Sequence, residues 1–203
     1  PYKFVDHTHA DSFIAISNSL QGEKIIKKIY DDLVIIIPYV MPGFDLAKLC
    51  AKYLDKGIKE GVIGILLLNH GIFSFGNTAE ESYNRMLKLV KISSNYLNKN
   101  IKLSTPKNIN NIINIEELAK LRKNVSNKVG KSMLLMSDRS NSNFSFCLRD
   151  DILKISQSGP ATPDHVIRTK RLPMVGRDLD LYSKKYQEYF NRNSKRYKKD
   201  LSI

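Results

Sequence analysis

The longest uninterrupted apolar run of the chain, Val62 to Leu68, constrains the fold more than any other segment. Its length and its content of Ile, Leu and Val are typical of a buried β-strand. The run is far shorter than the roughly 20 apolar residues that a transmembrane helix needs, so we expect no membrane-spanning segment. The segments around it have the spacing of strands and amphipathic helices, and together they predict the α/β fold class.

The pattern over residues 1–97 alternates between strands and helices. We expect strands over residues 2–9, 12–16, 33–37 and 72–75, which are rich in β-branched and aromatic residues. Apolar residues at helical spacing predict helices over residues 23–30 and 45–54. Thr78 followed by Glu81 is a capping box, which predicts a helix that continues to about Tyr96.

The second half of the chain has a different character. Residues 98–114 are polar and rich in Asn, as in a linker, so we predict two domains, 1–97 and 98–203. In the second domain we expect an α+β extension. It would contain helices over residues 115–129 and 178–199, short strands over 133–136 and 144–148, and a rigid loop over 159–165.

The charge is strongly basic but unevenly distributed. The net charge is +13, with 12 Lys or Arg against 10 Asp or Glu in residues 1–100 and 21 against 10 in residues 101–203. Because no helix-turn-helix, zinc-finger or RNA-binding aromatic motif accompanies the excess, we do not expect nucleic acid to be the partner. The chain also shows no signal peptide, which favours a cytoplasmic location.

Three of the four histidines occupy positions that suit a metal site. His7 and His9 are two residues apart, so in an extended chain their side chains lie on one face. His70 follows the buried strand, and Gly71 allows the backbone to approach closely. Three imidazoles with a fourth position open are typical of catalytic zinc, and Asp6 and Asp11 could orient the rings. A histidine at a strand end is, however, more often a hydrogen-bonded structural residue.

The chain resembles the class II aldolase/adducin head family. The resemblance rests on segments 4–10, 38–39, Gly43, 66–71 and 78–82: FVDHTHA, PY, the glycine, LLLNHG and TAEES. The later segment GPATPDHVIRTK, residues 159–170, is similar to the connector of bifunctional proteins that join a rhamnulose-1-phosphate aldolase to a short-chain dehydrogenase. The resemblance implies a mixed or mainly antiparallel central sheet flanked by helices, and a homo-oligomer.

The family resemblance also implies roles for individual residues. His7, His9 and His70 match the zinc ligands, although another divalent transition metal could occupy them. The substrate would be a deoxyketose 1-phosphate such as rhamnulose 1-phosphate, cleaved to dihydroxyacetone phosphate and lactaldehyde. Tyr39 is a candidate proton donor and His165 a candidate catalytic residue. Arg168 and Lys170 are candidate phosphate ligands.

The resemblance leaves parts of the machinery outside the sequence. The family's acid/base glutamate and phosphate-binding loop precede the His-x-His segment, so we expect the chain to be a fragment that is inactive alone. A following dehydrogenase domain would bind NAD, whereas this chain contains no glycine-rich dinucleotide motif. Two alternatives stay open: a related sugar-phosphate dehydratase, epimerase or decarboxylase, and a non-catalytic adducin-like head.

Overall fold

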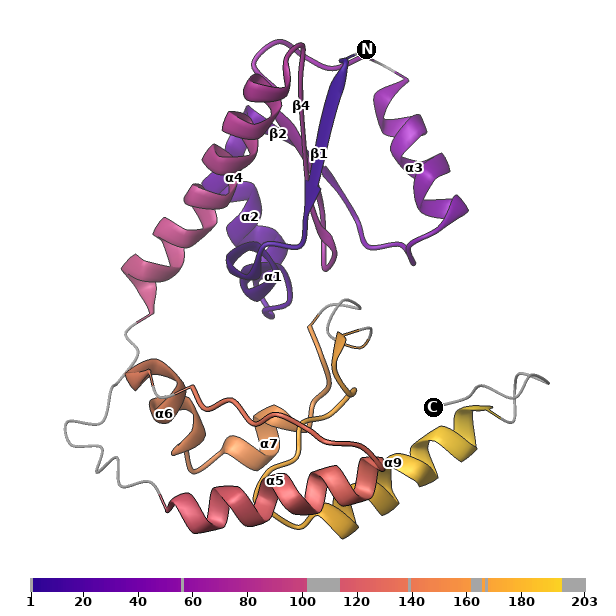
Figure 1. Cartoon of the computed structure of the whole chain (residues 1–203). Helices are drawn as coiled ribbons and strands as arrows, with labels where there is room; N and C mark the ends of the chain where they lie inside the picture. Colours follow the sequence, from indigo (N-terminus) through magenta and orange to yellow (C-terminus); the bar gives the residue numbers. More distant parts are fainter. Residues whose placement is uncertain are drawn as a thin grey trace. The chain divides into compact units, whose positions relative to one another are not determined.

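The computed structural model describes residues 2–55, 57–101, 114–138, 140–161, 166 and 168–194. The chain divides into two compact units, Pro1–Leu103 and Ser104–Ile203. Figure 1 shows the helices and strands of each unit, and each unit is described by itself below. Among the described residues, no helix combines the length and the apolar character needed to cross a membrane.

The first unit is built on a mixed four-stranded sheet. Its strands are β1 (Phe4–Thr8), β2 (Val34–Ile37), β3 (Gly64–Leu67) and β4 (Gly71–Gly76), in the order β1-β4-β3-β2. β2 and β3 run parallel, while β4 is antiparallel to both β3 and β1. The apolar run that begins at Val62 therefore supplies an inner strand whose four residues are all buried. The predicted α/β class with a mixed sheet is confirmed.

Helices cover both faces of this sheet (Figure 1). One face carries α1 (Asp11–Ser17), α2 (Gly22–Tyr30) and α4 (Ala79–Asn100), and the other carries α3 (Phe44–Leu54). A short 3-10 helix, η1 (Asp31–Leu33), leads from α2 into β2. Successive side chains of β3 point to opposite faces of the sheet, so this strand contributes to two cores. Leu66 packs toward α4, while Ile65 and Leu67 pack toward α3.

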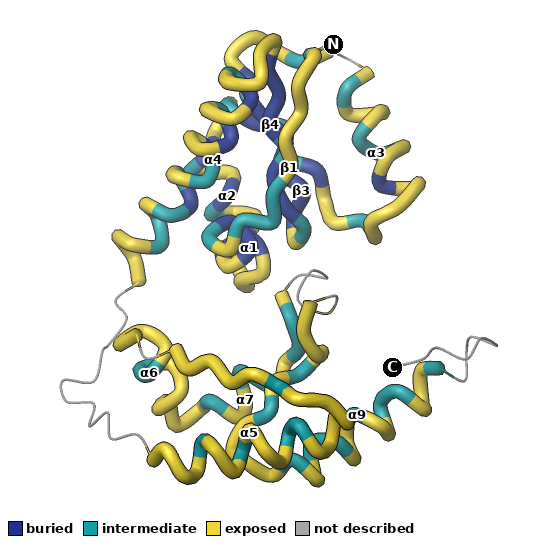
Figure 2. Tube along the Cα trace, in the orientation of Figure 1, coloured by how far each residue is buried: buried dark blue, intermediate teal, exposed yellow. Residues whose placement is uncertain are grey.

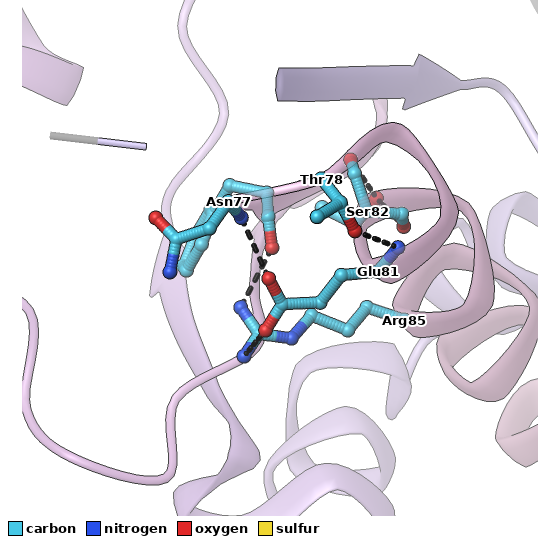
Figure 3. Close-up of polar contacts among 7 residues, drawn as sticks. Asn77, Thr78, Glu81, Ser82 and Arg85 are labelled. Atoms are coloured by element: carbon cyan, nitrogen blue, oxygen red, sulfur yellow. Dashed lines mark hydrogen bonds and ion pairs between the residues drawn. The ribbon is translucent and has the colours of Figure 1, made fainter. Parts of the chain in front are cut away.

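The N-cap predicted at the start of α4 is present, and the Glu81 side chain bonds back to Asn77, one residue before the expected Thr78 (Figure 3). Thr78 accepts a hydrogen bond from the backbone N–H of Glu81 at 3.1 Å, and the Glu81 carboxylate accepts one from the N–H of Asn77 at 2.6 Å. Ser74 of β4 donates to the Ser82 carbonyl at 2.8 Å, and Arg85 donates to the carbonyl of Phe75 at 2.7 Å. These bonds fix α4 against the end of β4.

One predicted strand of the first unit is wrong. Residues 12–16, expected to be extended, lie in helix α1. The helix buries Phe13, Ile14, Ile16 and Ser17, a spacing that places all four on the side that packs against α2 and α4. Burial of that apolar face outweighs the preference of Ile and Phe for strands.

The second unit is helical in its described residues. It contains α5 (Ile115–Val129), α6 (Asn141–Cys147), α7 (Ile152–Ser156) and α9 (Leu179–Ser194). α5 matches the prediction, and Gly130 ends it in the left-handed conformation with φ of 74°. None of the unit's described residues is buried, whereas Figure 2 shows the buried residues gathered in the sheet and helices of the first unit.

Both strands expected in the second unit are wrong. Residues 133–136 have no regular structure, and residues 144–147 belong to α6. Ser140 caps that helix by accepting from the N–H of Asn143, and a run of four or five apolar residues does not by itself distinguish strand from helix. The ends of two other predictions, residues 162–165 of the loop and 195–199 of the last helix, lie outside the described residues.

Candidate metal centre

The strand pairing brings three histidines to one edge of the sheet. β1 ends at this edge with Thr8 opposite Ile72, and β3 ends there with Leu67 opposite Gly71. His7 and His9 therefore come from the end of β1, while His70 comes from the tight connection between β3 and β4. Residues more than 60 positions apart in the sequence share one small volume.

The three imidazoles are close enough to share one ion. Their ring centroids are 4.8 Å apart for His7 and His9, 5.3 Å for His7 and His70, and 5.0 Å for His9 and His70. One nitrogen of each ring lies within 4.8 Å of the other two, and the Nε2 atoms of His7 and His9 are 3.0 Å apart. Two nitrogens on a tetrahedral zinc, bound at about 2.0–2.1 Å, lie about 3.3 Å from each other.

The ring of His7 is held in one tautomer. Its Nδ1 lies 3.0 Å from the backbone carbonyl oxygen of Ile72, and since a carbonyl can only accept, Nδ1 carries the proton. The lone pair is then on Nε2, the nitrogen that faces His9. Phe73, which pairs with His7 across the sheet, stacks on the ring at 4.1 Å with an interplanar angle of 17°. His7 is thus oriented as a metal ligand by a backbone carbonyl and an aromatic ring.

His70 supplies the observation that most favours a metal. Its Nδ1 is buried and has no hydrogen-bond partner among the described residues. Burial, followed by the nearby His7 and His9, lowers the pKa of His70 below its ordinary value and favours the neutral ring. Neutral imidazoles are the form that binds metals, and a buried nitrogen without a partner is costly unless something occupies it. The donor set therefore fits a zinc-like ion.

Asn69, the residue before His70, shapes the turn that carries the histidine. Asn69 adopts φ of 58°, and its side-chain amide donates to the Ser17 carbonyl at 3.1 Å and to Asn18 Oδ1 at 2.6 Å. Its backbone N–H donates to the Ser17 hydroxyl, so α1 holds the turn that carries His70. This role of Asn69 was not predicted from the sequence, although an Asn directly before His70 could have indicated a turn with positive φ, where Asn is enriched.

Gly71 allows the close approach that the sequence predicts. A Cβ at this position would lie 2.6 Å from the Thr8 carbonyl oxygen, 2.9 Å from His9 Cδ2 and 3.0 Å from His7 Cε1. Only glycine leaves room for both rings. The predicted ring-orienting role of Asp6 and Asp11 is replaced, for His7 Nδ1, by the Ile72 carbonyl.

The other candidate residues are not gathered at the histidines by any described contact. Tyr39 follows β2 at the same sheet edge, with half of its surface exposed and its hydroxyl 3.9 Å from Met41 Sδ. Arg168 and Lys170 belong to the second unit. Arg168 is exposed, and the Lys170 ammonium lies 4.2 Å from the centroid of the Tyr186 ring. His165 lies outside the described residues.

Comparison with known proteins relates each half of the chain to a described family. The class II aldolase and adducin N-terminal domain matches residues 1–97, and the second domain of class II aldolases matches residues 113–202. The chain is 28% identical over 220 residues to YuxG of Bacillus subtilis (strain 168), named as an uncharacterized oxidoreductase. The match covers 95% of this chain and 31% of YuxG, so the chain spans about a third of that relative.

Solved structures of the same kind are also similar. The N-terminal class II aldolase domain of a conserved Thermoplasma acidophilum protein is 39% identical, with 48% of this chain and 43% of that one covered and a TM-score of 0.42. A sugar-phosphate aldolase from Thermotoga maritima is 19% identical, with 48% and 46% covered and a TM-score of 0.39. With its two halves matched by two class II aldolase models, the chain belongs to the class II aldolase and adducin family.

Proposed function

We propose that this chain is the metal-binding part of a carbon–carbon lyase that cleaves a deoxyketose 1-phosphate, with rhamnulose 1-phosphate as the first candidate. The observation that carries the proposal is the convergence of three imidazoles, each of which has one nitrogen within 4.8 Å of the other two. A scaffold without catalysis has no need for three histidines gathered in this way. Membership of the family and the similarity to aldolases support the reaction class.

His7, His9 and His70 would hold the metal. When bound, zinc would supply Lewis-acid polarisation of the oxygens of the ketose phosphate. The chain's own contribution is the orientation of the rings. The Ile72 carbonyl fixes the tautomer of His7, Phe73 fixes its plane, and burial keeps His70 neutral. Three protein ligands leave a fourth position for substrate, as catalytic sites require.

The remaining roles are proposals that rest on the sequence. Tyr39 is the proposed proton donor, and its place after β2, at the sheet edge where β3 also ends, is compatible with that role. His165 is proposed to contact substrate, and Arg168 and Lys170 to hold its phosphate. We also propose a homo-oligomer and a cytoplasmic location.

The name of YuxG suggests how the chain fits a longer protein. YuxG is named as an oxidoreductase, and this chain corresponds to only 31% of its length. We propose that an NAD-binding dehydrogenase activity of such a protein resides outside the matched third and acts on a product of the lyase reaction.

The first test is the metal content of the purified chain by elemental analysis. We expect about one zinc per chain, lost in His70→Ala and retained in Ser12→Ala, which removes the partly buried hydrogen bond between Ser12 and Ser93 without removing a proposed ligand. His165→Ala shows whether the fourth histidine belongs to the same site. No metal in the parent chain, with His70→Ala folded as well as the parent, would overturn the metal site.

The second test is aldol cleavage, assayed on the full-length gene product with rhamnulose 1-phosphate. Release of dihydroxyacetone phosphate that depends on His70 supports the lyase. Metal binding together with epimerised, dehydrated or decarboxylated sugar phosphate would favour the related enzymes of the superfamily. Metal binding without turnover of any of these substrates would contradict the proposed reaction.

A further inference from the structure

The second unit contains a cavity that the metal function does not use. It has a volume of about 230 Å³ and lies between residues 171–172 and the helix α9. Three tyrosine rings of α9 and several charged side chains line it. The lining residues used below are Arg171, Tyr182, Lys185, Tyr186, Glu188, Tyr189 and Arg192.

The wall formed by residues 171–173 is fixed at two points. The Tyr182 hydroxyl donates to the Leu172 carbonyl at 2.7 Å, and the Gln157 side-chain amide donates to the Pro173 carbonyl at 3.2 Å. The Arg171 guanidinium lies 5.3 Å from the centroid of the Tyr189 ring. These contacts fix the backbone at residues 172–173 and place the exposed Arg171 guanidinium beside the Tyr189 ring.

The cavity has an excess of positive charge. Three cations, Arg171, Lys185 and Arg192, line it together with a single carboxylate, that of Glu188. None of the three cations forms an ion pair with another part of the chain that the structure describes. Elsewhere in the same unit, Lys128, Arg149 and Arg177 each pair with a carboxylate. The cavity therefore offers an uncompensated charge of about two units to an anion.

The size and the side chains of the cavity indicate which class of anion it would bind. About 230 Å³ is less than the roughly 300–1,000 Å³ of pockets for drug-sized ligands, which excludes a dinucleotide. Guanidinium groups bind phosphate oxygens in a fork geometry, and a phosphomonoester carries a charge of about −1.5 to −2 at pH 7. The tyrosine rings offer an apolar surface to a short carbon chain.

We propose that this cavity of the second unit binds a small phosphomonoester dianion, of the size of a three-carbon phosphate ester. The proposal does not rest on the metal function proposed above. Its cations are also distinct from Arg168 and from Lys170, whose ammonium lies over the Tyr186 ring.

The test is isothermal titration of the whole chain at low ionic strength with glycerol 3-phosphate, inorganic phosphate and succinate. All titrations use His70→Ala in the presence of a chelator, so that phosphate binding to a metal cannot contribute. We expect saturable 1:1 binding of the phosphate ester, weaker binding of inorganic phosphate and the weakest binding of succinate. Succinate binding as tightly as the ester would overturn the assignment to phosphomonoesters.

Variants locate the site. Lys185→Gln and Arg192→Gln should each weaken ester binding by about 10- to 100-fold, the usual effect of removing one charge-assisted hydrogen bond. Lys184→Gln is the matched control, because Lys184 is the exposed neighbour on α9, does not line the cavity and removes the same charge. An equal loss in Lys184→Gln and Lys185→Gln would show diffuse attraction by a basic surface and would overturn the site. Circular dichroism of each variant checks that α9 is intact.

Discussion

Gly71→Ala tests whether the close approach of β4 to the histidines is what assembles the metal centre. The added Cβ would lie 2.6 Å from the Thr8 carbonyl oxygen, while ordinary contact begins at about 3.4 Å, so the strands must separate by several tenths of an ångström. The same atom would lie 2.9 Å and 3.0 Å from carbons of the His9 and His7 rings. The two rings would therefore be displaced relative to His70.

The expected loss has two parts that can be measured separately. Overpacking of this kind costs about 1–3 kcal/mol of unfolding free energy, measured by urea denaturation of the metal-free chain. Displaced ligands should weaken zinc binding by about 10- to 100-fold, measured by competition with a chromogenic chelator. The affinity loss is the specific consequence of the geometry at the site.

Gly76→Ala provides the matched control. Gly76 ends the same strand, and its Cβ would lie 2.6 Å from the backbone nitrogen of Ser82 and 2.9 Å from Glu81 Cβ. Its cost in stability should be similar, but no histidine is in contact with the added atom. If both variants bind zinc with the affinity of the parent chain, or if both lose it equally, the reasoning about Gly71 is refuted.

Three further substitutions test contacts inside the first unit. Asn69→Ala should lower the unfolding free energy by about 1–2 kcal/mol and weaken zinc binding. The substitution removes the hydrogen bonds to Ser17 and Asn18 and replaces a residue that tolerates positive φ. Zinc affinity equal to that of the parent chain would contradict the role assigned to this turn. Tyr30→Phe should cost about 0.5–1.5 kcal/mol in urea denaturation, because it removes the buried hydrogen bond that the Tyr30 hydroxyl donates to the Leu89 carbonyl. Burial raises the pKa of Tyr30 from 10.0 to about 12, so stability present below pH 10 should fall as the pH rises toward 12, and the fall should be smaller in Tyr30→Phe. Thr78→Ala should lower the unfolding free energy by about 1 kcal/mol through loss of the cap on α4, and an unchanged urea midpoint would count against that cap.

The second unit shows where sequence patterns are ambiguous. The helix over residues 115–129 has a cap at Asn114, a left-handed Gly130 and apolar residues at helical spacing, and these local signals agree. Residues 144–148 offer only a short, mostly apolar segment, which suits either strand or helix, and residues 144–147 form part of α6. Residues 12–16 gave the same ambiguity in the first unit, where packing against α2 and α4 decided in favour of a helix.

The parts of the metal centre that depend on neighbouring residues can be predicted from the amino-acid sequence alone. It predicts that His7 and His9 lie on one face of an extended segment, because side chains two apart in an extended chain point the same way. It places His70 and the compact Gly71 directly after a buried strand. These are consequences of covalent geometry and of local apolar patterning.

Contacts between residues far apart in the chain depend on the tertiary fold. Strand order and register place His7 against Phe73 and the Ile72 carbonyl, 65 residues away, and the carbonyl fixes the tautomer in place of a predicted carboxylate. Packing of α1 against the turn at Asn69 positions His70. These long-range contacts depend on which surfaces are buried against each other, and the local pattern of apolar residues does not specify this.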